Sequence, residues 1–235
     1  MDKITRKELK SDKFAQEVEL GVEYVTGHRQ QMMIYGGIAA LIVVVALLVF
    51  GYRRHQATAR QEVFTAALEI QQAAIGPQES PFVKSYATEQ ERSAAASKAF
   101  RDVASRYPSS DEGQMSKYYL GALSAEQGNQ AEAVKWLQDV AENGSDRYAS
   151  LAKLLLADLY VNDGKIDEAD KLLRSLMKNP TEFVSQEQAT IALAQVLAKK
   201  NPAEARKLLD PLKMNTRGTV SQAALTILSQ LPPSK

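Results

Sequence analysis

GNQAEAVKWLQ at residues 128–138, GKIDEADKLLR at 164–174 and KNPAEARKLLD at 200–210 are three versions of one pattern. The Glu-Ala pair inside each version recurs every 36 residues. A fixed period of this length is typical of stacked supersecondary units, none of which can bury its apolar face alone. The second half of the chain is therefore predicted to be a repeat array.

Small residues recur at matching places in two helical segments of each repeat. In the upstream segment they are Gly121, Ala157 and Ala194, and in the downstream segment they are Ala133, Ala169 and Ala205. Two antiparallel helices can approach closely only where small side chains face each other, so each repeat is predicted to be a tight helix pair. Leu137, Leu173 and Leu209 follow four residues later, and we expect them to fill the space against the neighbouring pair.

Glycines mark the turns of the first two pairs. Gly128 and Gly164 stand where a residue that tolerates positive φ ends a helix at low cost. The third pair has Asn201-Pro202 instead. The stretch 215–231, NTRGTVSQAALTILSQL, continues with one more amphipathic helix, which is predicted to cap the last apolar face.

This pattern resembles the tetratricopeptide repeat, whose signature is W-x2-L-G-x2-Y, then A-x3-F, then P. The central repeat reads Lys153-x2-Leu156-Ala157-x2-Tyr160, then Ala169-x3-Leu173, then Pro180, and an earlier second-helix element reads Ala96-x3-Phe100 and ends at Pro108. Lys or Thr replaces the Trp in each repeat, and the period is 36 rather than the family's 34. The resemblance implies an all-α solenoid, which we place at residues 87–231 with its capping helix.

Residues 32–52 are the longest apolar stretch of the chain. These 21 residues contain no Asp, Glu, Lys or Arg. As a helix they would rise about 31 Å, close to the roughly 30 Å hydrocarbon core of a bilayer. The run is longer than the apolar core of a cleaved signal peptide and follows a 31-residue segment, so we predict a single uncleaved transmembrane helix.

The segments on either side of the apolar stretch are charged. Residues 1–31 are predicted to be an amphipathic helical head with Phe14, Val18, Val22 and Val25 on one side, and residues 53–86 a helical extension and linker. The helical part of this extension is expected to run to Ile75. Its Val63, Phe64, Ala67 and Leu68 are expected to pack against the helix that ends at Pro108.

The charge pattern leaves the orientation open. Six Lys/Arg in the whole head favour a cytoplasmic N-terminus, whereas Arg53 and Arg54 outweigh Arg29 next to the span. An uncleaved span followed directly by divergent tetratricopeptide repeats resembles the YfgM-like family of bacterial inner-membrane proteins. That resemblance implies a cytoplasmic N-terminus and a periplasmic repeat domain. It also implies an ancillary, chaperone-like role at the SecYEG translocon, with SecYEG and periplasmic chaperones as partners.

Signatures of catalysis are weak in this sequence. There is no cysteine, phosphate loop, dinucleotide fingerprint or H-E-x-x-H motif. Ser150-x-x-Lys153 has the spelling of a nucleophile and its base, but the companion motifs are missing. A net charge of +1 does not favour nucleic acid as a partner. We therefore predict a binding protein, not an enzyme, without cofactor or metal. Gly36 and Ala40 form a small-x3-small pair through which two spans could associate.

The first helices of stacked pairs line the concave face of such an array. The repeat register assigns to this face Met115, Tyr118, Ala122, Leu154, Asp158, Ile191 and Gln195. Most of this set is apolar or aromatic, and it lacks the cluster of Lys, Arg and Asn that would clamp a terminal carboxylate. The predicted groove therefore suits an extended or helical apolar segment, although some of its members could instead pack against neighbouring repeats.

Two functions remain open at this level. One is a membrane-tethered helper of protein export that holds partner chains near the translocon. The other is an envelope scaffold that coordinates a division or wall-synthesis complex, since the repeat domain of the YfgM-like family is related to that of a cell-division coordinator. The sequence features above are common to both.

Overall fold

The computed structural model describes residues 29–77, 84–214 and 217–232. In chain order its elements are α2 Arg29–Gln71, β1 Ala74–Ile75, β2 Ser85–Tyr86, α3 Glu89–Arg106, α4 Asp111–Glu126, α5 Gln130–Asn143, α6 Asp146–Asn162, α7 Ile166–Lys178, α8 Gln186–Lys200, α9 Pro202–Leu209, a 3-10 turn η1 Asp210–Leu212 and α10 Gly218–Gln230. The predicted all-α fold, a long apolar helix followed by a helical repeat array, is confirmed. The amphipathic helix predicted around Phe14 to Val25 lies outside the described residues.

The chain divides into two compact units, with the boundary between Thr58 and Ala59. The described part of the first unit is a stretch of α2 that is long and apolar enough to cross a membrane. Its large side chains are exposed, with 52% of Val44 and 68% of Leu48 accessible. Among the described residues nothing buries this apolar stretch. An apolar helix of this length with its side chains uncovered is typical of a helix that faces lipid.

The second unit begins inside α2 at Ala59, earlier than the predicted start of the repeat domain at residue 87. The end of α2 is the first helix of the first pair, and α3 is the second. Ala67 of α2 is buried in one cluster with Ala96 and Phe100 of α3, and Phe64 and Leu68 pack against that cluster. The expected packing against the helix that ends before Pro108 is confirmed for Phe64, Ala67 and Leu68, whereas Val63 is not part of this cluster.

A short strand pair follows α2. The helix predicted to run to Ile75 ends at Gln71, and Ala74 and Ile75 pair in parallel with Ser85 and Tyr86. Gly76 turns the chain out of β1 with φ +84°. The prediction of helix at Ile75 is therefore wrong, because the backbone groups there bond to a second strand instead of to the preceding helical turn.

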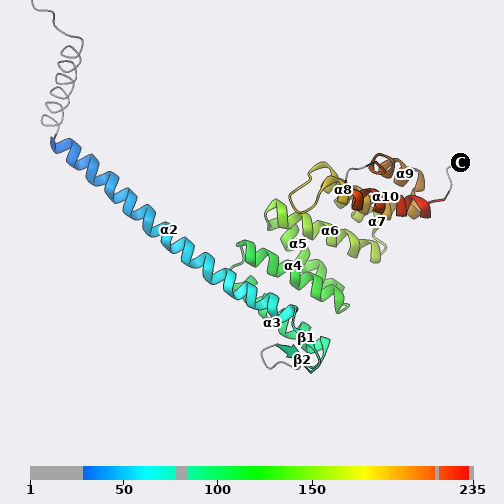
Figure 1. Cartoon of the computed structure of the whole chain (residues 1–235), viewed down its shortest axis with the longest axis horizontal. Coiled ribbons are helices and arrows are strands. Elements are labelled where there is room, and N and C mark those ends of the chain that lie inside the picture. The colour runs from blue at the N-terminus through cyan, green and yellow to red at the C-terminus, as the bar shows by residue number, and fades with distance from the viewer. Residues whose placement is uncertain (1–28, 78–83, 215–216, 233–235) are drawn as a thin grey trace, which may run out of the picture. The chain divides into compact units, whose positions relative to one another are not determined.

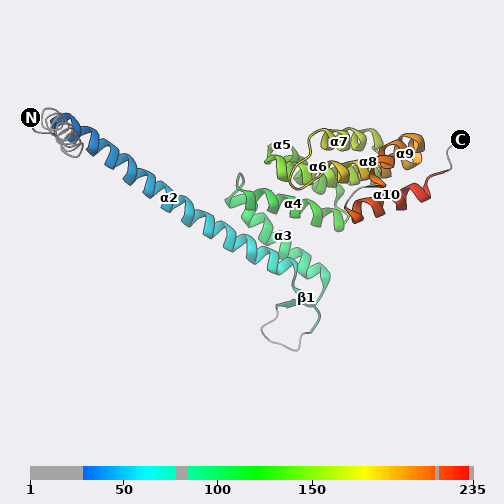
Figure 2. The same cartoon turned by 45° about the horizontal axis from the view of Figure 1, so that its top comes forward.

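Three further helix pairs follow one another along the unit, namely α4 with α5, α6 with α7, and α8 with α9 (Figures 1 and 2). Each helix packs against the next in the chain. In addition, α4 contacts α6, and α8 contacts α10. The first helices of successive pairs thus form one layer of the unit, as a solenoid of helix pairs requires.

The turns inside the pairs follow the glycine pattern. Gly128 and Gly164 have φ +77° and +75°. The amide of Asn129 donates to the carbonyl of Ser124 at 2.8 Å, and that of Gly128 donates to Ala125 at 3.0 Å. These two bonds are the Schellman arrangement, which satisfies helix-terminal carbonyls when the next residue adopts a left-handed conformation. The Gly164 turn repeats it.

The third turn is built differently. Asn201 caps α9, and its side chain accepts a hydrogen bond from the amide of Glu204 at 3.3 Å. Pro202 occupies the first turn of α9, where its missing amide hydrogen removes no helical bond. The turn before α9 is thus built on Asn201 and Pro202, as the sequence predicts.

The predicted small residues lie where the helices of a pair meet. Ala133, Ala169 and Ala205 are fully buried. A Cβ atom on Gly121 would lie 2.6 Å from Cγ of Leu137, so this leucine packs onto its own pair as well as into the cluster that contains Ala152 of the next pair. Leu137 therefore packs against the neighbouring pair as expected, and it also contacts its own pair.

The last helix closes the array. The buried side chains of α10 are Ala224, Ile227 and Leu228. They belong to the same core cluster as Leu193 of α8 and Leu209 of α9. The predicted capping helix is thus confirmed, and it covers apolar surface that the pair of α8 and α9 would otherwise expose.

Candidate protein-binding groove

A groove of about 390 Å³ opens between α6 and α8 of the repeat unit. Its lining residues are Leu154, Ala157, Asp158, Val161, Leu173, Gln188, Ile191, Ala192, Gln195 and Val196. Known ligand pockets measure about 300–1,000 Å³, so this groove has room for a few side chains of a partner. It does not have room for a folded domain.

The spacing of these residues along the helices explains the groove. On α6, Leu154, Asp158 and Val161 follow one another at helical intervals, so they share one face. The five lining residues of α8 begin at Gln188 and end at Val196 with the same periodicity. Leu173 of α7 lies beneath them and is only 1% exposed. The two first helices are the walls, and the second helix between them supplies part of the floor.

Small side chains create the open space. Ala157 is buried at the contact between α6 and α7, and Ala192 is half-buried on the groove side of α8. A larger residue at position 192 would fill the groove. Leu154, Val161 and Ile191 are partly buried and pack on the same core cluster, so the groove is an extension of that core to the surface.

Four of the seven residues assigned from the sequence line this groove, namely Leu154, Asp158, Ile191 and Gln195. The other three, Met115, Tyr118 and Ala122, lie on α4 and are not among its lining residues. Tyr118 packs on a different core cluster, which contains Leu137 of α5 and Leu156 of α6, and burial raises the pKa of its phenol.

Sequence reasoning missed six of the lining residues. They are Ala157, Val161, Leu173, Gln188, Ala192 and Val196. Most of them stand three or four residues from an assigned position on the same helix, so extension of the helical spacing beyond the repeat signature would have found them. Leu173 had been assigned to the core contact, which it also makes.

The rim of the groove is polar. Asp158, Gln188 and Gln195 are exposed at its edge. Within residues 29–77, 84–214 and 217–232, the side chains of these three residues make no hydrogen bond or ion pair. The rim therefore offers one carboxylate and two amides to a ligand above an apolar floor.

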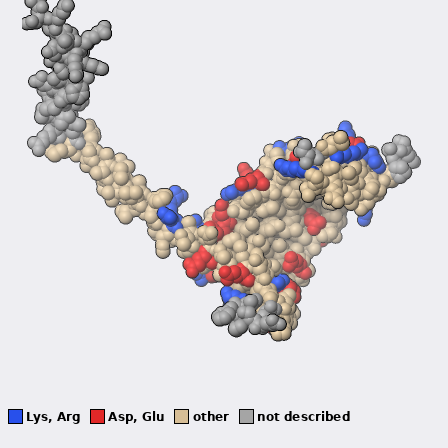
Figure 3. All heavy atoms as spheres, viewed as in Figure 1, with Lys and Arg blue, Asp and Glu red and all other residues tan. Residues whose placement is uncertain are grey.

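A second hollow of about 370 Å³ adjoins the groove at Gln195. It lies between α8 and α10 and is lined by Gln195, Thr219, Gln222, Ala223, Thr226 and Ile227. No side chain in this set is charged. In Figure 3 most Lys, Arg, Asp and Glu side chains of the repeat unit stand around the margin of the visible face, and its middle is largely uncharged.

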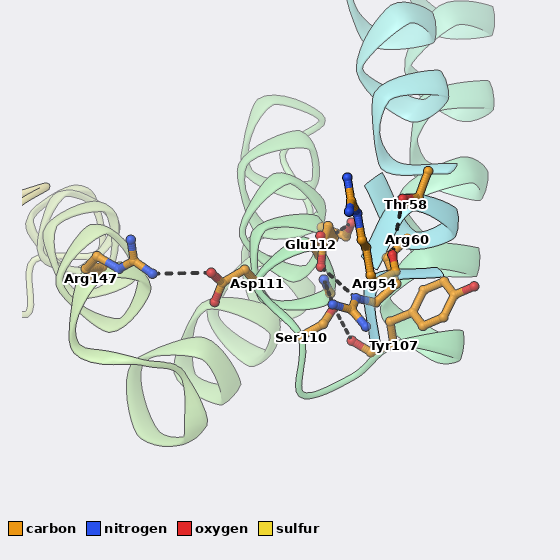
Figure 4. A network of polar contacts seen from close by, with 10 residues as sticks. Arg54, Thr58, Arg60, Tyr107, Ser110, Asp111, Glu112 and Arg147 are labelled. Carbon is orange, nitrogen blue, oxygen red and sulfur yellow. Dashed lines mark hydrogen bonds and ion pairs between the residues drawn. The ribbon is translucent and has the colours of Figure 1, made fainter. Parts of the chain in front are cut away.

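A chain of polar contacts holds the first helices together at one end. Arg147 of α6 pairs with Asp111 of α4 at 3.2 Å, and Arg60 pairs with Glu112 at 3.2 Å (Figure 4). The guanidinium of Arg147 also lies 5.6 Å from the ring centroid of Phe183, in the segment before α8. The two ion pairs connect α6 and α2 to α4, and the contact with Phe183 connects α6 to the segment before α8.

Ser150 and Lys153 of the Ser-x-x-Lys motif line a separate hollow of about 290 Å³ beside α7. The Ser150 hydroxyl is buried, donates to the carbonyl of Arg147 at 2.7 Å and lies 2.7 Å from the Thr181 hydroxyl. This serine therefore joins α6 to the segment before α8. In the part of the chain that the structure describes, no group of three or more His, Cys, Asp or Glu residues is arranged to hold a metal ion.

Comparison with known families gives one match. Residues 142–217 match the family of the tetratricopeptide repeat-like domain. The matched segment contains α6, α7, α8 and α9 and therefore both walls of the groove. The comparisons with curated proteins and with solved structures gave no match. A repeat-like domain of this class, in an all-helical fold, is typical of modules that bind other proteins.

Proposed function

We propose that this chain is a membrane-anchored protein-binding module, and that the groove between α6 and α8 takes an apolar segment of another protein. The observation that carries the proposal is the groove itself, in which a core of Leu154, Leu173 and Ile191 reaches the surface between polar edges. Peptide recognition by helical grooves has this form, since apolar anchors supply the affinity and rim groups supply orientation.

The groove acts by binding, not by catalysis. Its lining contains one ionisable side chain, Asp158, and no nucleophile beside a base. Nucleophilic catalysis is recognised by a nucleophile within hydrogen-bond reach of a base, and the lining of this groove offers no such pair. Binding of an extended or helical segment needs only the apolar floor and the amides.

We infer that the module works at the periplasmic face of a bacterial inner membrane, with the N-terminus in the cytoplasm. The apolar stretch of α2 supports a single-span anchor, and the layout of span and repeats resembles the YfgM-like family. On this basis the proposed role is that of an ancillary, chaperone-like factor of the Sec translocon. Its partners would be translocon subunits and chains that emerge from the channel.

The groove is tested by two kinds of variant in the full chain, reconstituted in detergent. Leu154→Ala with Ile191→Ala removes apolar anchors, and Ala192→Phe fills the groove without removing any apolar contact. Both should weaken the binding of an unfolded, leucine-rich peptide at least tenfold, which corresponds to about 1.4 kcal/mol. The matched control is Ala203→Phe, at an exposed alanine of α9 outside the groove.

Melting curves separate the outcomes. Ala192→Phe should melt close to the wild-type temperature while it binds weakly. Undiminished peptide binding by both variants would overturn the assignment of this groove, and it would leave the membrane anchor as a separate proposal.

The partner is tested by a photo-crosslinking residue placed at Gln188, on the rim of the groove. Crosslinks to translocon subunits or to nascent secreted chains would support the export role. Crosslinks to division or wall-synthesis proteins would instead favour the envelope scaffold. Added protease should digest the repeat unit in intact spheroplasts, and protection of that unit would overturn the periplasmic location.

A further inference from the structure

Asp158 is unusual among the aspartates of the structure. Seven aspartates of the described ranges form an ion pair, and they are Asp102, Asp111, Asp139, Asp163, Asp167, Asp170 and Asp210. In those same ranges Asp146 and Asp158 form none. These two cases therefore need separate explanations.

The negative charge of Asp146 is explained by its position in its own helix. It lies in the first turn of α6, where unsatisfied amide groups and the helix dipole stabilise a negative charge. Asp158 lies near the other end of the same helix, whose last turn contains no basic residue. The helix dipole gives a carboxylate no stabilisation there. Nothing in its own helix accounts for a charge at position 158.

The surroundings of Asp158 are apolar. The neighbouring wall and floor of the groove are Ala157, Val161 and Leu173 on its own side, with Ile191 across the groove. A ligand that covers this floor also excludes water from the carboxylate. An uncompensated charge in such a site opposes binding, and a cation on the ligand offsets this cost.

The two amide side chains of the rim further restrict the class of ligand that the groove can bind. Gln188 and Gln195 stand seven residues apart on α8 and so lie on the same face, both at the groove. An amide side chain can donate and accept at once, which matches the main-chain groups of a peptide. Those groups are unpaired in an extended segment, whereas a helix satisfies its own.

We propose that the groove selects extended peptide segments that combine apolar side chains with a Lys or Arg, and that Asp158 holds this cation. The inference rests on the proposed function of the groove and specifies its ligand. The apolar side chains lie on the floor, the amides of Gln188 and Gln195 bond to the peptide main chain, and the cation pairs with the carboxylate at the rim. Segments with a Glu at the same place are rejected.

The test uses three fluorescent peptides of about ten residues, which in extended form span about 30 Å. They alternate Leu and Ser and differ at one central serine position, which carries Lys, Gln or Glu. Binding to the full chain in detergent is followed by anisotropy at low and high salt. Wild type should bind the Lys peptide at least threefold more tightly than the Gln peptide and at least tenfold more tightly than the Glu peptide. High salt should reduce both ratios.

Variants assign the preference to one carboxylate. Asp158→Asn should bind all three peptides with similar affinity, and Asp158→Lys should prefer the Glu peptide. Glu142→Gln is the matched control, because it removes one exposed carboxylate of α5 outside the groove and should keep the wild-type order.

The outcomes distinguish the two proposals. Equal binding of the three peptides by wild type, abolished by Ala192→Phe, would overturn the charge selection and leave the apolar groove in place. A preference for Lys that persists in Asp158→Asn would also overturn the role of this residue. Failure of every peptide to bind wild type would overturn the proposed function together with this inference.

Discussion

Cγ of Leu137 lies 2.6 Å from the point that a Cβ atom would occupy on Gly121. Real Cβ atoms do not approach another carbon this closely, so α4 and α5 are as near to each other here as a glycine permits. The second and third pairs have Ala157 and Ala194 at the matching position, and both are buried. The first of the three pairs is therefore packed more closely at this point than a residue with a side chain would allow.

Gly121→Ala should destabilise the repeat unit by about 1 kcal/mol. Overpacking typically costs about 1–3 kcal/mol, and removal of a glycine from a helix interior offsets about 0.5–1 kcal/mol of that. Urea denaturation of the soluble repeat unit measures the difference. The double variant with Leu137→Ala should lose less stability than the sum of its single changes, and strict additivity would contradict this contact.

Gly164→Ala should cost about 1–2 kcal/mol for a different reason. No atom lies within 4 Å of the added Cβ, but the residue has φ +75°. A left-handed conformation costs an L-residue with a side chain roughly 1–2 kcal/mol. Gly218→Ala is the control, since this position also has open space and lacks a positive φ. Equal denaturation midpoints for the two variants would show that the turn has relaxed.

A soluble fragment that begins at residue 59 should fold, and one that begins at residue 87 should not fold stably. The shorter fragment lacks Phe64, Ala67 and Leu68, which cover the fully buried Phe100. Loss of several such contacts, at about 1.5–3 kcal/mol for each fully buried large side chain, removes much of the stability of a small domain. Circular dichroism melting compares the two fragments. A cooperative transition at the same temperature in both would show that α2 is dispensable.

The Lys117–Asp139 pair should make stability depend on pH in the acid range. The Lys117 ammonium lies 2.7 Å from the Asp139 carboxylate, and this bond holds the pKa of the carboxyl below its ordinary value. A lowered pKa in the folded state contributes stability that is complete above the unfolded value of about 3.9 and disappears as the pH falls through the folded value.

Asp139→Asn should therefore lower the free energy of unfolding by about 0.5–1 kcal/mol at pH 7, in the range of partly exposed pairs. As the pH falls through the lowered pKa of Asp139, the variant and wild type should converge. Urea midpoints across this range measure the difference, with Glu142→Gln as the control at an exposed site. A constant difference at every pH would mean that packing of the side chain, not its charge, is responsible.

Val44→Arg should impair membrane insertion. Val44 stands in the middle of the charge-free stretch 32–52, and an arginine at the centre of a span costs about 2.5–3.5 kcal/mol of insertion. Wild type and the control Val44→Leu should stay in the membrane pellet after alkaline carbonate extraction, and Val44→Arg should be partly released. Release of full-length wild type would contradict the anchor.

The fold was predictable from the sequence where one signal repeats. The Glu-Ala spacing, the glycines at 128 and 164 and the apolar stretch each gave the element that the structure contains. These features act locally or at a fixed period, so a single sequence is enough to detect them. The capping helix followed from the same reasoning, because the last apolar face needs a cover.

The strand pair and much of the groove lining could not be predicted from the sequence. Ala74 and Ser85 pair in strands of only two residues each, which are too short to show an alternating pattern in the sequence. Prediction of the groove required knowledge of which first helices leave space between them. The repeat register placed Tyr118 and Leu154 on one face. Which of these side chains lines a groove depends on how deeply each is packed, and Tyr118 packs against another core cluster. Asp111 and Arg147 were predictable in principle, since they lie 36 residues apart at equivalent places.

The cap at α10 also limits how the repeat array of this chain can be lengthened. Ala224, Ile227 and Leu228 occupy the surface on which the first helix of a further pair would stack, and the end of α2 occupies the corresponding surface of α3. Duplication at either end of the array would therefore leave an uncovered pair. A longer binding surface can arise only by insertion of whole 36-residue units between existing pairs. Relatives with longer grooves should differ from this chain by internal insertions of about that length, while both ends stay unchanged.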